Sequence, residues 1–113
     1  MNLFERMVRE QYAKHDEWPW PVEDYIQVFR LFTEAYKYNM GHDHPAIRMK
    51  HIPQLMYLMP ILDPDDPSPI LEADDYPVLI ESYFETPFQN CNYQIWHFFS
   101  GQVRLMRAYE VLL

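Results

Sequence analysis

Ten prolines against only two glycines set the strongest limit on what this chain of 113 residues can fold into. Proline lacks an amide donor and disfavours helical geometry in the residue before it, so prolines mark where helices begin, end or kink. Between the prolines, apolar residues recur at helical spacing, and no segment shows the two-residue alternation and paired turn signals of a sheet. We therefore expect an all-α fold, an irregular compact bundle of five to six helices with proline-marked corners.

The clearest expected helix is opened by Pro21 and runs to about Asn39. Its apolar residues step by three, four, three and four, and charged or amide side chains form the opposite stripe. Gly41 is available as a left-handed stop for this helix. The apolar stripe consists of Val22, Tyr25, Phe29, Phe32 and Tyr36.

Further helices are expected on both sides of it. The first spans about 3–14, and another begins at Pro45, with a kink or restart near Pro53. After an extended, stiff acidic connection over 63–69, a helix capped by Asp74 or Asp75 carries four residues toward the core. These are Val78, Leu79, Tyr83 and Phe84.

Near the carboxyl terminus, Asn92 can cap a short aromatic helix, and a last helix follows Gly101.

Near the amino-terminal end, Trp18 and Trp20 do not fall on a core stripe. Either they fold back over the junction of the first two helices, which we favour, or they form an apolar surface for a partner.

A single domain over 1–113 suits the length and the composition. A chain of this size removes roughly two-thirds of its unfolded surface from water on folding, so it needs no disulfide or metal for stability. Cys91 is the only cysteine, which excludes an internal disulfide and suits a reducing compartment. The sequence has no signal-peptide pattern and no continuous apolar span, and we expect a cytoplasmic protein.

The formal net charge of −8 comes entirely from the middle of the chain. Outside residues 51–103 the acids and bases balance, whereas inside that segment there is no Lys or Arg at all. The acids of the segment are Asp63, Asp65, Asp66, Glu72, Asp74, Asp75, Glu81 and Glu85.

The acidic stretch has two interpretations. In the first, it is a solvated loop and a helix cap that keep an aromatic-rich protein in solution. In the second, which gives the functional prediction, a non-enzymatic interaction module (an accessory protein or inhibitor) docks on a basic surface of a partner protein, with aromatic anchors and acidic steering. Nucleic-acid-binding proteins offer such surfaces. The predicted partner-binding residues are Asp63, Asp65, Asp66, Glu72, Asp74, Asp75, Tyr57 and Tyr76.

An alternative form of this function is mimicry of DNA, as in small acidic inhibitors carried by phages and mobile elements. Eight acids in this segment are far fewer than the phosphates of a duplex, which carries one charge per ~1.7 Å of axis. Direct binding of nucleic acid is disfavoured by a pI of about 4.9. The chain also lacks glycine-rich phosphate loops and a nucleophile elbow, so we expect no enzyme of those classes.

Two constellations keep other chemistry open. His42, His44 and His51 have the ligand types for zinc or another divalent ion, although such residues after a glycine also cap helix ends. No cofactor is otherwise indicated. Cys91 and His97 could form a nucleophile and base, but across a turn and a short helix nothing in the spacing forces them together, and a buried apolar cysteine is the plainer interpretation.

Overall fold

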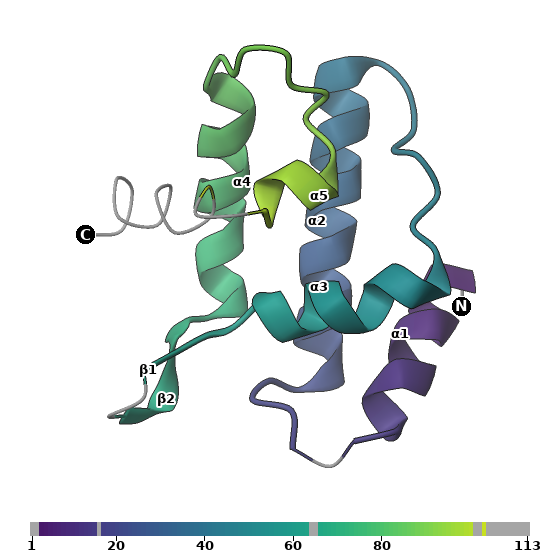
Figure 1. The fold of residues 1–113 in the computed structure, drawn as a ribbon, viewed down its shortest axis with the longest axis vertical. Coiled ribbons are helices and arrows are strands. Elements are labelled where there is room, and N and C mark those ends of the chain that lie inside the picture. Colours follow the sequence, from purple (N-terminus) through teal and green to yellow (C-terminus); the bar gives the residue numbers. More distant parts are fainter. Residues whose placement is uncertain (1–2, 16, 64–65, 101–102, 104–113) are drawn as a thin grey trace. The chain divides into compact units, whose positions relative to one another are not determined.

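The structure is a computed structural model, and its main feature is a succession of helices (Figure 1). It describes residues 3–15, 17–63, 66–100 and 103. Within these residues there are five α-helices, two short 3-10 turns and one antiparallel hairpin of two strands. The prediction of a mostly helical chain is confirmed, and the predicted last helix lies outside the described residues, apart from Val103.

The chain divides into two compact units, and each takes two separate segments of the sequence. The first unit comprises Met1–Phe29 and Ala46–Ala73, and the second comprises Arg30–Pro45 and Asp74–Leu113. Helix α2 (Val22–Met40) contributes its beginning to the first unit and the rest to the second. The organisation of the chain as a single domain stays a prediction.

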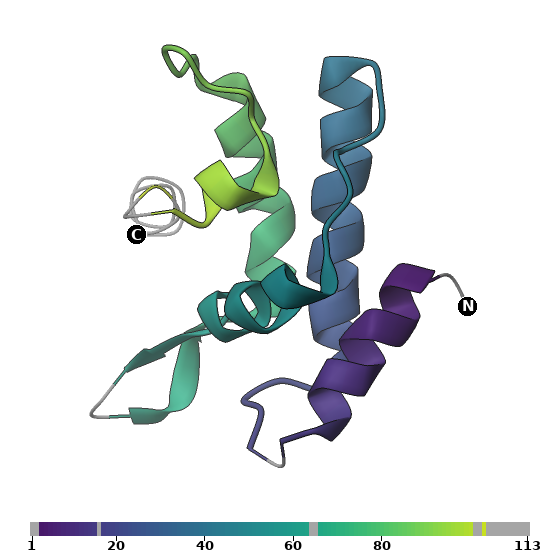
Figure 2. The same cartoon turned by 45° about the vertical axis from the view of Figure 1, so that its right-hand side comes forward.

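In the first unit, α1 (Leu3–Ala13) lies beside the beginning of α2 (Figures 1 and 2). The ring of Phe4 meets Phe29 edge to face, with centroids 4.8 Å apart, and Val8 is fully buried one turn further along α1. Both helices begin and end within one residue of the bounds expected from periodicity. Their apolar stripes therefore fix this pairing.

The Trp-Pro-Trp-Pro corner closes the turn between these helices. The indole N–H of Trp18 donates to the Tyr12 carbonyl, and the Tyr12 hydroxyl donates to the Trp20 carbonyl, each over 2.9 Å. Trp20 is only 4% exposed and packs on Tyr25, with ring centroids 5.1 Å apart. Burial raises the pKa of Tyr25 to about 12. The two tryptophans thus fold back over the junction, as favoured above.

Helix α3 (Ile52–Leu58) begins later than expected. The segment after Pro45 has no regular secondary structure, and only a 3-10 turn (Met49–His51) precedes the helix. Pro53 lies in the first turn of α3, where its missing amide donor would have no helical partner in any case. The predicted restart near Pro53 is correct, whereas the predicted start at Pro45 is wrong.

The acidic connection after α3 is a hairpin, whereas the sequence pattern predicts an extended connection without a sheet. Strand β1 (Ile61–Asp63) pairs antiparallel with β2 (Asp66–Leu71), with Ile61 opposite Leu71 and Asp63 opposite Asp66. The register shifts twice within this short ladder. Prolines in β2 cannot donate to a partner, but both strands of a two-stranded sheet are edges, where proline is tolerated.

The second unit joins the later part of α2 to α4 (Tyr76–Glu85) and α5 (Ile95–Phe98). Its core is aromatic. Phe32 of α2, Tyr83 of α4 and Phe98 of α5 are all fully buried, and their ring centroids lie 5.0 to 6.0 Å apart. Gly41 ends α2 with a φ of +81°, the left-handed stop expected from the sequence.

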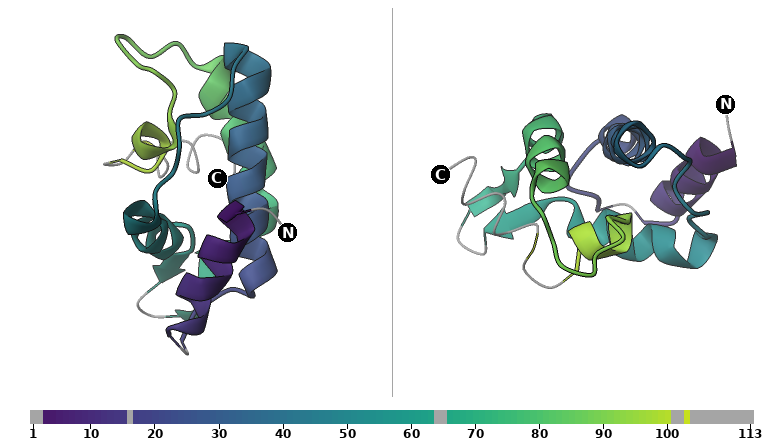
Figure 3. Two further views of the ribbon diagram at one scale, coloured as in Figure 1. Left: turned by 90° about the vertical axis from the view of Figure 1, so that its right-hand side faces the viewer. Right: turned by 90° about the horizontal axis from the view of Figure 1, so that it is seen from above.

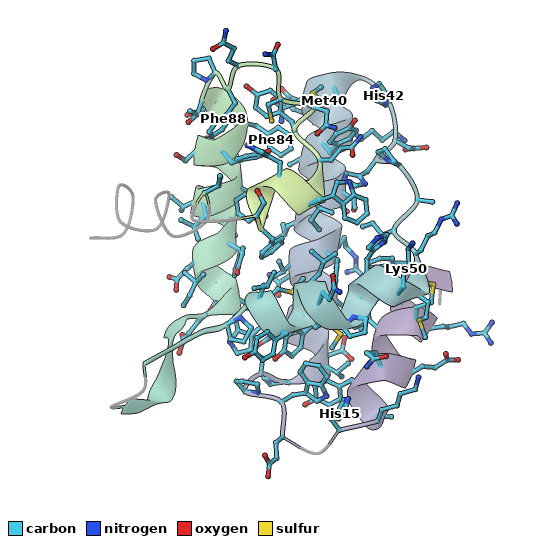
Figure 4. The ribbon with its side chains drawn as sticks, in the orientation of Figure 1. His15, Met40, His42, Lys50, Phe84 and Phe88 are labelled. Carbon is cyan, nitrogen blue, oxygen red and sulfur yellow. The ribbon has the colours of Figure 1, made fainter. Side chains whose placement is uncertain are left out.

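A connection from Thr86 to Gln94 leaves the carboxyl end of α4 and turns back to α5 (Figure 3). Figure 4 shows Phe84 and Phe88 at the end of α4 where this connection begins. None of the helices in the described part of the chain has both the length and the apolar character that a membrane span requires.

The Trp-Pro corner gives a test of the first unit. We expect Trp20→Ala to lower the free energy of unfolding by about 3 to 5 kcal/mol, since it removes a buried indole and leaves a cavity. Tyr38→Ala is the matched control, because Tyr38 is 89% exposed and its loss should cost less than about 0.5 kcal/mol. Urea unfolding of both variants measures the difference. Equal losses of unfolding free energy in the two variants would mean that the buried Trp20 contributes no more to stability than an exposed side chain.

Candidate functional site

The acids predicted for partner binding do not all belong to one unit. Asp63 and Asp66 lie opposite each other in the hairpin of the first unit, and Glu72 is exposed just after it. Asp65 lies outside the described residues. Asp63 and Asp66 therefore lie in strands, and not in an irregular loop or at a helix cap.

The two acids before α4 belong to the second unit. Asp74 is exposed and Asp75 half-buried, in a 3-10 turn (Ala73–Asp75) that leads directly into the helix. Asp75 stands at the N-cap position, but its side chain makes no capping hydrogen bond. The predicted helix start at this point is confirmed.

The two predicted aromatic anchors have opposite environments. Tyr57 of α3 is 77% exposed, and it borders an open, mostly apolar hollow of about 490 Å³ with Pro53, Gln54 and Leu58. Tyr76 is fully buried and packs against Phe98 and Phe99. Tyr76 was expected to border the acidic stretch as a partner-binding residue, and this is wrong, because Tyr76 belongs to the core stripe of α4.

Helix α4 presents an outward face that the partner-binding prediction missed. Its buried stripe is Tyr76, Leu79, Ile80 and Tyr83, so residues on the other side of the helix are left toward solvent. Val78 was expected in the core but is 46% exposed, and Glu81 and Glu85 are exposed one turn apart. The i, i+4 spacing of the two glutamates was the signal that could have identified this face. We call Asp74, Val78, Glu81 and Glu85 the acidic face.

The acidic face is uncompensated within the described residues. Neither Asp74, Glu81 nor Glu85 has a basic partner there within 4.0 Å, whereas Arg9 pairs with Glu23 and Lys37 with Asp43 elsewhere. All of α4 also lies inside the segment of sequence that contains no Lys or Arg.

His44 caps α5 across 51 positions of sequence. Its Nε2 accepts a hydrogen bond from the Ile95 amide over 2.9 Å, while its Nδ1–H donates to the Pro45 carbonyl over 2.7 Å. These two bonds assign the neutral imidazole with the proton on Nδ1. Burial lowers the pKa of His44 below its ordinary 6.5, although the bond to Pro45 opposes that shift.

The three predicted metal ligands do not all belong to one unit. His42 and His44 belong to the second unit and His51 to the first. Both ring nitrogens of His44 are occupied by backbone groups. Among the described residues, no three His, Cys, Asp or Glu side chains gather closely enough to hold a metal ion.

Cys91 and His97, by contrast, are brought into contact. The Sγ of Cys91 lies 3.3 Å from Nδ1 of His97, and the hydroxyl of Tyr83 lies 2.7 Å from the same nitrogen and 3.6 Å from the sulfur. The Tyr93 amide donates to the sulfur over 3.2 Å. Cys91 is half-buried rather than a core residue.

Tyr93 fixes the loop that carries this cysteine. Its hydroxyl donates to the Thr86 carbonyl over 2.7 Å and accepts from the Phe88 amide over 3.0 Å. Its φ is +56°, and Asn90 on the other side of Cys91 has a φ of +57°. A left-handed conformation costs a non-glycine residue roughly 1 to 2 kcal/mol, so the hydrogen bonds and ring contacts must offset it. No sequence signal marks a tyrosine for this conformation.

Comparisons of the chain with protein-family models, with curated proteins and with solved structures give no match. The function is therefore inferred from the residues of this chain alone.

The His44 cap predicts how stability depends on pH. Because the pKa of His44 is lower in the folded chain than in the unfolded one, the unfolded chain binds the extra proton first. The contribution of neutral His44 is thus fully present above about pH 6.5 and is lost as the pH falls below that value.

We expect His44→Phe to keep the ring packing but lose the Nε2 acceptor, at a cost of about 1 to 3 kcal/mol at neutral pH. The variant should also show a shallower loss of unfolding free energy between about pH 7 and pH 5, measured by urea titration. His42→Gln, two residues away and exposed, should keep the wild-type slope. If His44→Phe keeps it too, the cap does not titrate as described.

Proposed function

We propose that this chain is a non-enzymatic protein–protein interaction module that docks on a basic surface of a partner protein through the acidic face of α4. The observation that carries the proposal is the outward face of α4, where Glu81 and Glu85 are exposed next to an exposed valine. Accessory and inhibitory proteins both act through such contacts.

The arrangement of this face suits recognition of a basic surface. Carboxylates four residues apart on a helix project from the same side, so their spacing is held by the helix backbone. Val78 adds an apolar contact, 46% exposed, within the same face. Acidic side chains raise the rate of encounter with a basic partner and disfavour acidic ones, while apolar contact contributes most of the affinity.

The position of the face on a packed helix also favours binding over mere solvation. Tyr76, Leu79 and Tyr83 hold the opposite side of α4 in an aromatic core. A partner therefore meets side chains whose backbone is already ordered, which reduces the entropy lost on association. An acidic loop serving only solubility would need no such support.

Charge reversal on α4 tests the proposal. We expect Glu81→Lys combined with Glu85→Lys to weaken partner binding at least about tenfold with the helix content unchanged, because two favourable charge contacts become repulsive. Glu10→Lys combined with Glu34→Lys is the matched control, since it makes the same charge change at exposed helical positions on α1 and α2. The control should bind like the wild type.

The measurement starts from affinity capture in extracts of the native host, with salt elution, followed by titration of the purified captured protein against all three forms. A partner that salt releases and that only the α4 variant loses supports the proposal. Equal retention by both double variants, or equal loss, contradicts it. Competition by duplex DNA for the same partner would identify the DNA-mimic form of the function.

A further inference from the structure

The Tyr83, Cys91 and His97 cluster has an arrangement that packing alone does not require. A small apolar cysteine needs only dispersion contacts, yet this sulfur is within 3.6 Å of an imidazole nitrogen, a phenol oxygen and a backbone amide. A nucleophile and a base within hydrogen-bond reach of each other are the two components of an activated thiol.

The Tyr83 hydroxyl can serve both protonation states of His97. Burial raises the pKa of this hydroxyl well above its ordinary 10.0, so it stays protonated and donates to the neutral Nδ1 of His97 over 2.7 Å. When Nδ1 gains a proton, the same oxygen can accept a hydrogen bond from it and turn its own hydrogen toward the sulfur. A proton can therefore move from the thiol to His97 without leaving a buried group unpaired.

The backbone helps to hold the negative sulfur that such a transfer creates. The Tyr93 amide points at Sγ from within a loop fixed by the bonds of the Tyr93 hydroxyl to Thr86 and Phe88. Its donor is already in place before any reaction, so little reorganisation is needed. Cys91 is only half-buried, and its neighbours Asn90 and Asn92 are exposed, so the thiol lies at the edge of the core.

We propose that Cys91 is a thiol-modification site at which His97 acts as the base, and that its reactants are disulfides of small thiols. In the step, the S–H proton passes to the Tyr83 oxygen while the Tyr83 hydroxyl proton passes to Nδ1 of His97, and the sulfur attacks one sulfur of the disulfide. A new S–S bond forms to Cys91, the old S–S bond breaks, and the released thiolate takes the proton from His97. Cys91 is oxidised to the mixed disulfide and the released thiol is the reduced product.

The adduct formed at this site persists until another thiol removes it. Cys91 is the only cysteine of the chain, so no second thiol of the same chain can resolve the mixed disulfide. The modification is thus reversible, and its removal depends on the concentration of small thiols in solution.

The test measures how fast the folded protein reacts with a coloured aromatic disulfide, dithiobis(nitrobenzoate), at neutral pH. The control is the Gln89→Cys, Cys91→Ser variant. It keeps His97 but moves the single thiol to an exposed position of the same loop, outside the cluster with Tyr83 and His97. We expect Cys91 to react at least about tenfold faster than this control thiol, although it is less exposed. A rate equal to or below that of the control overturns the proposal.

His97→Gln tests the role of the base. It should lower the rate at Cys91 about tenfold or more while circular dichroism stays unchanged. An unchanged rate in a folded variant overturns the proposal. If this variant does not fold, the comparison of the wild type with the exposed-thiol control decides alone. Mass spectrometry after incubation with glutathione disulfide should show one glutathione per chain, removed by a small reducing thiol, and the absence of this adduct also overturns the proposal.

Discussion

The buried hydroxyl of Tyr83 is the constraint on which the second unit depends. Its ring lies at the centre of the aromatic core, in contact with Phe32 and Phe98, and a phenol oxygen at that depth must find a hydrogen-bond partner. His97 supplies it over 2.7 Å. This one bond joins α4 to α5, brings the imidazole next to Cys91, and leaves the opposite side of α4 to carry the exposed carboxylates. The ring of Tyr83 therefore belongs to the apolar core, and its hydroxyl belongs to the polar cluster.

Structure that follows from local periodicity could be predicted from the sequence, whereas structure that depends on contacts distant in sequence could not. Helices α1 and α2 were predicted within one residue at each end because their apolar stripes are long and regular, and Gly41 marked the stop of α2. The hairpin after α3 was missed, because prolines in β2 hide its alternation and its ladder is irregular. On α4, Leu79 and Tyr83 were correctly placed in the core, whereas Val78 was placed there wrongly, because two adjacent apolar residues do not show which of them is buried.

The candidate sites show the same division. The base-free segment could be read directly from the sequence, but which of its acids share a surface depended on the phase of α4 and on the burial of Tyr76. The pairing of Cys91 with His97 could not be predicted, because it requires a tyrosine in a left-handed conformation and a phenol from α4. Such a conformation is retained only when the surrounding contacts outweigh its cost, which a local reading of the sequence cannot evaluate.

The bond between His44 and Ile95 has a consequence for the order in which the second unit forms. A helix as short as α5 is not stable in isolation, because closing its first turn costs more conformational entropy than one hydrogen bond returns. The acceptor that fixes this turn comes from a residue 51 positions earlier in the chain. Closing so long a loop is slow, and it becomes favourable only after α2 and α4, the helices that precede His44 and α5, are in place. Helix α5, and with it the loop of Cys91, should therefore be among the last parts of the molecule to become ordered and among the first to open.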